Sequence, residues 1–126
     1  LDTRLSAGDR IRQMSAATTD LGDELVGGGD LNTQPWIWLD GTVPLTGTEA
    51  VLGESHAEIV DDYMAAQAFT GAIDPDEATM RVPAFSMRLD NLYARDYTIT
   101  AAGVEHLDGS DHWPIWLDLA WGDCRP

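Results

Sequence analysis

Apolar side chains recur every three or four positions in two stretches of the chain, and this spacing predicts two amphipathic helices. The first is expected over residues 9 to 21 or 25, and the second over residues 54 to 69. The periodic apolar positions are Ile11, Met14, Ala17 and Leu21, then Ile59, Val60, Tyr63, Met64 and Ala66. Arg10 lies on or near the polar side of the first helix and His56 near the start of the second, so both are expected at the surface.

Alternating apolar and polar positions predict β-strands in the rest of the chain. The expected strands cover residues 1–4, 24–29, 86–95, 97–104 and 113–121. The strand at 24–29 is short and apolar at its start, which predicts a buried strand that ends in glycines. The last strand places Trp113, Ile115, Leu117, Leu119 and Trp121 on one side, which predicts packing on a core. Residues 40–53 are rich in Gly, Thr and Pro and are expected to form a loop.

The composition is that of an acidic globular protein, and the length is that of one domain or less. The 126 residues are 44% apolar, which supports a core, and no apolar run approaches the roughly 18 residues of a membrane span. There are 22 acidic residues, seven arginines and no lysine, for a net charge of −15. This charge repels phosphate polyanions at ordinary salt. Two compatible explanations stay open: adaptation to high salt, and a site whose bound cations supply the positive charge.

Polar side chains gather at three points at the ends or on the faces of predicted strands. They are Gly29-Asp30-Leu31-Asn32, Arg88-Leu89-Asp90 and Ser110-Asp111-His112. Asp30 and Asn32 stand two residues apart, which on an extended backbone directs both side chains to one side. Arg88 and Asp90 share a face of the strand at 86–95, where they could simply pair with each other. Each group alone is typical of a solvated turn or loop.

Together the three groups contain side chains suited to a metal site. Their carboxylates suit a hard divalent cation, His112 suits proton transfer or anion binding, and the Asn32 amide suits a phosphoryl oxygen. Carboxylates with few thiols or imidazoles favour Mg²⁺ or Mn²⁺ over Zn²⁺. Two other interpretations remain: a non-catalytic acidic binding module, and a salt-adapted structural domain without a site.

The order and the flanks of these motifs resemble a known family. Gly-Asp-Leu-Asn, Arg-Leu-Asp and Ser-Asp-His, with a helix between the first two, resemble the last three motifs of the endonuclease/exonuclease/phosphatase (deoxyribonuclease-I-like) superfamily. The flanking residues in 28–35 and 109–114 also match. The resemblance implies an α+β fold, half of a four-layer α/β/β/α sandwich of mostly antiparallel sheet with flanking helices.

The resemblance also implies a role for each matching residue. Asp30 would position or deprotonate the attacking water, and Asp30 and Asp111 would ligate Mg²⁺ or Mn²⁺. Asn32 would hold a non-bridging phosphate oxygen. Asp90 would accept a hydrogen bond from the ring of His112 and fix its tautomer. His112 would contact the scissile phosphate and assist proton transfer; whether it or Asp30 is the base stays open.

The implied function is a metal-dependent phosphoesterase acting on nucleic acid, a phospholipid or a small phosphorylated molecule. The loops at 35–53 and 74–83 are acidic and aromatic, which disfavours a tight grip on DNA. Residues 1–126 are expected to be the C-terminal half of one domain. In the family a strand that ends in His comes just before the first of the two helices, and Leu1-Asp2-Thr3-Arg4 corresponds to the residues that directly follow that His. The N-terminal half is expected to supply further metal ligands, so this part alone is expected to be inactive.

Overall fold

The computed structural model describes residues 7–33, 37–39, 43–45, 56–82 and 85–121. Its first elements are α1 (Ala7–Thr18), β1 (Leu25–Asp30), β2 (Ile37–Leu39), β3 (Val43–Leu45) and α3 (His56–Ala66). The remaining elements are β4 (Thr70–Gly71), β5 (Met80–Val82), β6 (Phe85–Met87), β7 (Asp90–Arg95), β8 (Tyr97–Val104) and β9 (Ile115–Trp121). These helices and antiparallel strands confirm the predicted α+β class.

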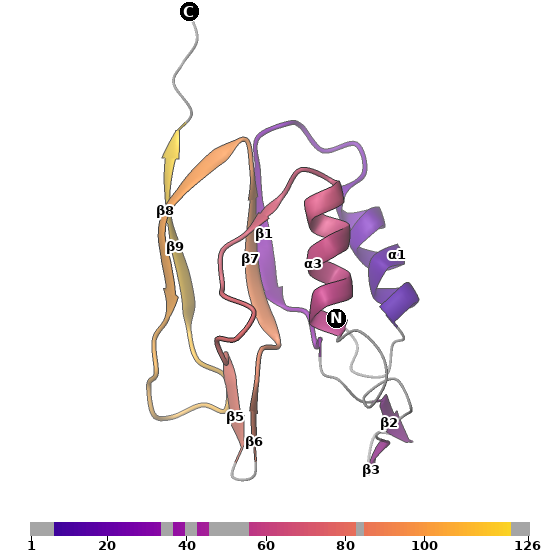
Figure 1. The fold of residues 1–126 in the computed structure, drawn as a ribbon, viewed down its shortest axis with the longest axis vertical. Helices are drawn as coiled ribbons and strands as arrows, with labels where there is room; N and C mark the ends of the chain where they lie inside the picture. Colours follow the sequence, from indigo (N-terminus) through magenta and orange to yellow (C-terminus); the bar gives the residue numbers. More distant parts are fainter. Residues whose placement is uncertain (1–6, 34–36, 40–42, 46–55, 83–84, 122–126) are drawn as a thin grey trace, which may run out of the picture.

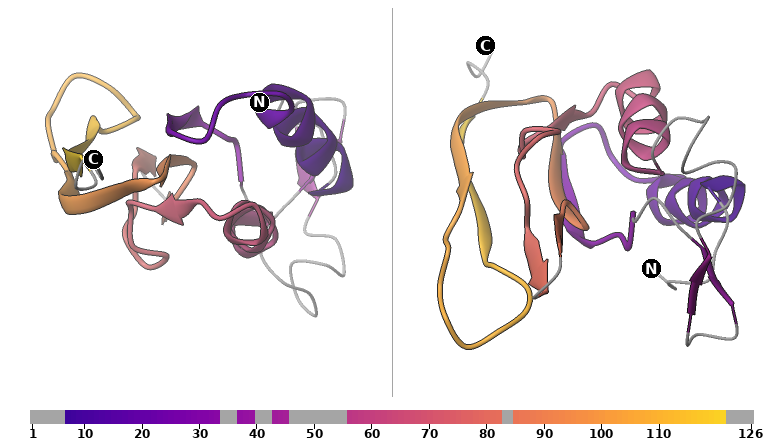
Figure 2. Two further views of the ribbon diagram at one scale, coloured as in Figure 1. Left: turned by 90° about the horizontal axis from the view of Figure 1, so that it is seen from above. Right: turned by 60° about the horizontal axis from the view of Figure 1, so that its bottom comes forward.

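Strand β7 is the centre of the fold. It pairs antiparallel with β1 on one side and β4 on the other, giving a three-stranded sheet in the order β1-β7-β4. The other strands form three antiparallel hairpins, β2–β3, β5–β6 and β8–β9. Figures 1 and 2 show α1 and α3 on one side of the three-stranded sheet and the β8–β9 hairpin on the other.

The core lies between the two helices and the sheet. Its buried residues are Met14, Leu31, Val60, Met64, Phe69 and Tyr93. Val60 and Met64 are one turn apart on α3, so both face inward, as the helical spacing predicts. Both predicted helices are confirmed, although α1 ends at Thr18 and not at residue 21 or 25. The chain turns there because Asp20 has a left-handed backbone with φ of 58°.

Two polar residues expected at the surface are buried. Arg10 is fully buried, and its Nη1 donates to the carbonyl oxygen of Leu31 at 2.6 Å. His56 is only 5% exposed at the start of α3. Helical periodicity assigns a residue to a face of one helix, whereas burial depends on which other segments pack against that face. The predicted exposure of Arg10 and His56 was therefore wrong.

Two predicted strands differ from those observed. The strand at 24–29 was expected to be buried, but among the described strands β1 stands at the edge of the sheet, and Val26 is 45% exposed. The predicted strand at 86–95 is divided into β6 and β7, with Arg88 and Leu89 between them. The ladder is interrupted because the amides of Leu89 and Asp90 donate to the hydroxyl of Thr79, each at 3.0 Å.

The last two strands form a hairpin that packs beside β7. Strand β8 has the predicted bounds, 97–104, and β9 begins at Ile115. The expected core packing of the last strand is wrong, because its residues are at best half-buried and Trp121 is 73% exposed. Trp121 instead contacts Tyr97 edge to face, with ring centroids 5.4 Å apart.

The segment after the first motif holds two short strands, one of which lies within the stretch expected to be a loop. Strand β2 pairs with β3, and β3 lies inside the range 40–53. The predicted strand at 1–4 and the rest of 40–53 lie outside the described residues. In the described part of the chain, no helix is long and apolar enough to cross a membrane.

Candidate functional site: the Asp30, Asp90 and His112 cluster

The first two motifs meet at one end of the three-stranded sheet. Asp30 ends β1 and Asp90 begins β7, and the two residues are direct partners in the antiparallel register. Directly opposed residues in such a pair project their side chains from the same face. Asp30 is exposed, whereas Asp90 is 8% exposed. The pairing therefore holds two carboxylates side by side, one open to solvent and one buried.

Asn32 reaches Asp30 through a turn. The structure gives Asn32 a left-handed φ of 49°, so the extended backbone that the sequence argument assumed ends at Asp30. The backbone amide of Asn32 donates to Asp30 Oδ1 at 2.9 Å, and its side-chain Nδ2 donates to Oδ2 at 3.1 Å. The two side chains thus come together as expected, but for a different reason: the turn folds the amide back onto the carboxylate.

The third motif joins the site through His112. Its Nδ1 lies 2.9 Å from Asp90 Oδ2, and its side chain is 32% exposed. Burial alone would lower the pKa of His112, but the hydrogen bond and charge of Asp90 and the charges of Asp30 and Asp111 outweigh it and raise the pKa above the ordinary value. Carboxylates from all three motifs therefore act on one imidazole.

Backbone contacts with β5 place the His112 loop. Met80 and His112 form an isolated antiparallel bridge, and the amide of Arg81 donates to the carbonyl of Asp111 at 2.9 Å. The Asp111 side chain is exposed beside His112. The hydroxyl of Ser110 accepts from the amide of His112 at 3.2 Å. The loop is thus fixed to a strand, and with it the position of the imidazole.

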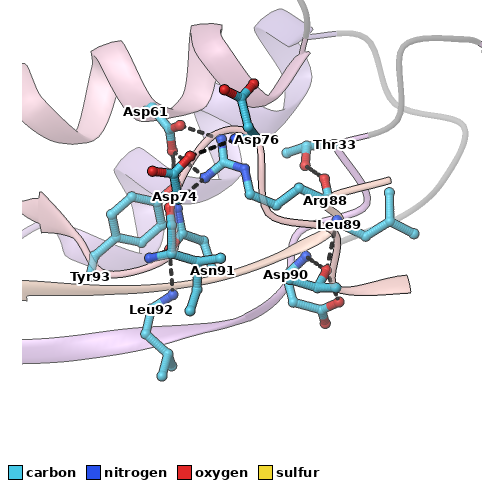
Figure 3. Close-up of polar contacts among 12 residues, drawn as sticks. Thr33, Asp61, Asp74, Asp76, Arg88, Leu89, Asp90, Asn91, Leu92 and Tyr93 are labelled. Atoms are coloured by element: carbon cyan, nitrogen blue, oxygen red, sulfur yellow. Dashed lines mark hydrogen bonds and ion pairs between the residues drawn. The ribbon is translucent and has the colours of Figure 1, made fainter. Parts of the chain in front are cut away.

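Arg88 does not pair with Asp90, although the two share a motif. Its guanidinium forms an ion pair with Asp61 of α3, which also accepts hydrogen bonds from Tyr93 and Asn91. Figure 3 shows Arg88 directed toward α3 and Asp90 directed away from it. The simple alternative of an Arg88–Asp90 pair is therefore wrong, and the Asp90 carboxylate contacts His112 instead.

Two residues of this region carried no signal in the sequence. Thr79 is fully buried, and its hydroxyl donates to Asp90 Oδ2 at 2.7 Å. Asp61 is one of 22 acidic residues in the chain, yet it forms an ion pair with Arg88. Both act through contacts at least ten residues away along the chain, which periodicity and spacing do not reveal.

Two hollows border the cluster. One, of about 440 Å³, includes His112 and is otherwise lined by residues 107–110 and by Trp113 and Pro114. The other, of about 330 Å³, runs between α1 and β1 and includes Asp30 among mostly apolar residues. Asp30 and the imidazole of His112 can thus be approached from the surface.

The donor set suits a hard cation only in part. Among the described residues, no group of three or more His, Cys, Asp or Glu side chains is placed to hold a metal ion. Mg²⁺, however, usually keeps several waters and takes one or two carboxylates plus substrate phosphates. Asp30 and Asp111 can supply carboxylates of that kind, and both are exposed.

Comparisons of the chain with protein-family models, with curated protein sequences and with solved structures gave no match.

Proposed function

We propose that this chain carries part of the active site of a metal-dependent phosphoesterase that uses Mg²⁺ or Mn²⁺. The observation that carries the proposal is the buried Asp90 bonded to the half-exposed His112, with Asp30 opposite Asp90 and Asp111 next to His112. A buried carboxylate that holds an imidazole at the edge of a hollow is an arrangement suited to proton transfer.

Charge repulsion at the site supports a cationic ligand. Asp30 and Asp90 are directly opposed, and like charges in that position destabilise a pair of strands. A proton on His112 offsets part of this repulsion. A divalent cation at Asp30 and Asp111 would offset more, and it would also attract the phosphate that a chain of net charge −15 otherwise repels.

In the proposed reaction each residue has a defined role. Asp30 orients the attacking water, and Asn32 directs its amide toward a non-bridging phosphate oxygen. His112 contacts the scissile phosphate and transfers a proton, while Asp90 holds its ring. Bound Mg²⁺ would neutralise charge that develops on the phosphoryl group. The substrate is a phosphoester: nucleic acid, phospholipid or a small phosphorylated molecule.

The proposal extends to the fold, as half of a four-layer α/β/β/α sandwich whose other half covers the sheet. Exposed apolar side chains support this part: Val26 is 45% exposed, Trp116 39% and Trp121 73%. Large apolar side chains on strands normally pack against another layer. Because the proposed other half would also supply further metal ligands, we expect little turnover by residues 1–126 alone.

Metal binding by residues 1–126 provides the first test. Mn²⁺ added to ¹⁵N-labelled protein should broaden the amide signals of Asp30, Asp111 and His112. Asp30→Asn with Asp111→Asn should abolish this selective broadening, whereas Asp118→Asn, an exposed acid on β9, should leave it unchanged. Uniform broadening over the acidic surface would contradict the metal site.

Hydrolysis provides the second test and uses the complete protein. Bis(4-nitrophenyl) phosphate should be cleaved in the presence of Mg²⁺, and His112→Ala should lower kcat by about 100-fold or more. His106→Ala is the matched control, because His106 lies in the same loop and is 57% exposed. Selective Mn²⁺ binding without hydrolysis would favour the alternative of a non-catalytic acidic binding module.

A further inference from the structure

Thr79 contacts both Asp90 and the loop that carries His112. It stands just before β5 and is fully buried. Its hydroxyl lies 2.7 Å from Asp90 Oδ2, and its carbonyl accepts a hydrogen bond from the amide of Trp113 at 2.8 Å. One residue therefore holds the carboxylate through its side chain and the histidine loop through its backbone.

The direction of the Thr79 hydroxyl proton follows from its contacts. The oxygen accepts from the amides of Leu89 and Asp90, each at 3.0 Å. A hydroxyl has two acceptor lone pairs and one proton, so both lone pairs are used and the proton is left for Asp90 Oδ2. The buried hydroxyl is thus a fixed donor to that oxygen.

The same Asp90 oxygen also faces His112. Oδ2 lies 2.9 Å from His112 Nδ1, so Thr79 and His112 approach one oxygen from two sides. An ionised carboxylate only accepts hydrogen bonds, so the imidazole must carry a proton on Nδ1. The tautomer of a histidine is set by the bond that one ring nitrogen makes, and here Nε2 becomes the nitrogen available for proton transfer.

We propose that Thr79 is a positioning residue, whose hydroxyl locks the Asp90 carboxylate in the orientation that keeps the Nδ1–H tautomer of His112. It acts through Asp90 and touches neither phosphate nor water in the proposed reaction. The inference deepens the proposed function, because it concerns the same site. The His112 tautomer is measured without substrate or metal, so the inference about Thr79 would still hold if the protein did not hydrolyse phosphoesters.

The test is the ring ¹⁵N spectrum of His112 in residues 1–126, recorded above the pH at which the ring loses its proton. The parent protein should show the Nδ1–H tautomer. In Thr79→Val, which keeps the size of the side chain but not the hydroxyl, the Nδ1–H fraction should fall to about half or less. Thr79→Ser restores the hydroxyl and should restore the tautomer.

The outcomes separate positioning from mere packing. A folded Thr79→Val protein with the parent tautomer would overturn the proposal, and so would loss of the tautomer in Thr79→Ser. The ring signals of His106 provide an internal control, since that side chain is 57% exposed and bonds to neither Thr79 nor Asp90 in the contacts described.

If Thr79→Val does not fold, the hydroxyl proton of Thr79 in the parent protein tests the proposal. A hydroxyl locked between two amides and a carboxylate should give a slowly exchanging proton signal that correlates with the Thr79 Hβ. Its presence, with the tautomer kept in Thr79→Ser, supports the proposal. A hydroxyl in rapid exchange with water would overturn it.

Discussion

Asp61 ties α3 to the strand that carries the candidate site. It forms an ion pair with Arg88 and accepts a hydrogen bond from Tyr93 Oη at 2.6 Å. Burial, followed by the contact with Asp61, raises the pKa of Tyr93 far above its ordinary value, so its hydroxyl remains a donor. The Arg88 side chain is only 6% exposed, and among the described residues Asp61 is the carboxylate that forms an ion pair with it.

Asp61→Asn should therefore destabilise the fold by about 3 kcal/mol, because it leaves the buried Arg88 charge uncompensated. The measurement is the free energy of unfolding in urea. Asp62→Asn is the matched control: Asp62 is the next residue on α3, is exposed, and should change stability by less than about 0.5 kcal/mol. Equal effects of the two substitutions would show that Asp61 acts only through the general surface charge.

At the scale of elements, the glycines of β1 have different tasks. A Cβ on Gly28 would lie 2.1 Å from the backbone oxygen of Asn91 and 2.8 Å from Leu92 Cα, so only glycine allows β1 to pair with β7 at this point. A Cβ on Gly27 would meet nothing within 4 Å. Close pairing here matters for the site, because the same ladder ends in the Asp30–Asp90 pair.

Gly28→Ala should force the two strands apart and cost about 1–3 kcal/mol of stability, measured by urea unfolding. It should also move the amide signals of Asp30 and Asp90, which end the ladder. Gly27→Ala is expected to be neutral or to stabilise by about 0.5 kcal/mol, since alanine restricts the unfolded chain. A Gly28→Ala protein as stable as the parent would refute the close approach.

At the scale of the whole molecule, charge is the dominant feature. A net charge of −15 on 126 residues favours expansion of the chain through self-repulsion. Salt weakens this repulsion, because the Debye screening length falls from about 30 Å at 0.01 M salt to about 3 Å at 1 M. The midpoint of urea unfolding should therefore rise when NaCl is raised from low concentration to 1 M.

A charge-reduced variant makes this prediction specific. It carries Asp→Asn changes at four exposed positions away from the site: Asp20, Asp62, Asp96 and Asp118. At low salt it should be more stable than the parent by about 1 kcal/mol, and its response to NaCl should be smaller. A parent protein whose unfolding midpoint does not change with NaCl would rule out self-repulsion as a cost of folding.

Local patterns in the sequence determined several features of this protein. Helical spacing predicted both helices, because Val60 and Met64 lie on one face whatever packs against it. Alternation predicted β8 with its observed bounds, 97–104. Short polar motifs at strand ends drew attention to Asp30, Asp90 and His112, which the structure brings together.

Contacts between distant segments decided the rest. The register of β1 with β7 places Asp30 opposite Asp90, and the bridge to β5 brings His112 to the same carboxylate. The burial of Arg10, the division of the strand at 86–95 and the role of Thr79 also follow from such contacts. The physical reason is that hydrogen bonds and burial depend on which segments meet in three dimensions, whereas the sequence pattern records only the periodicity of each segment by itself.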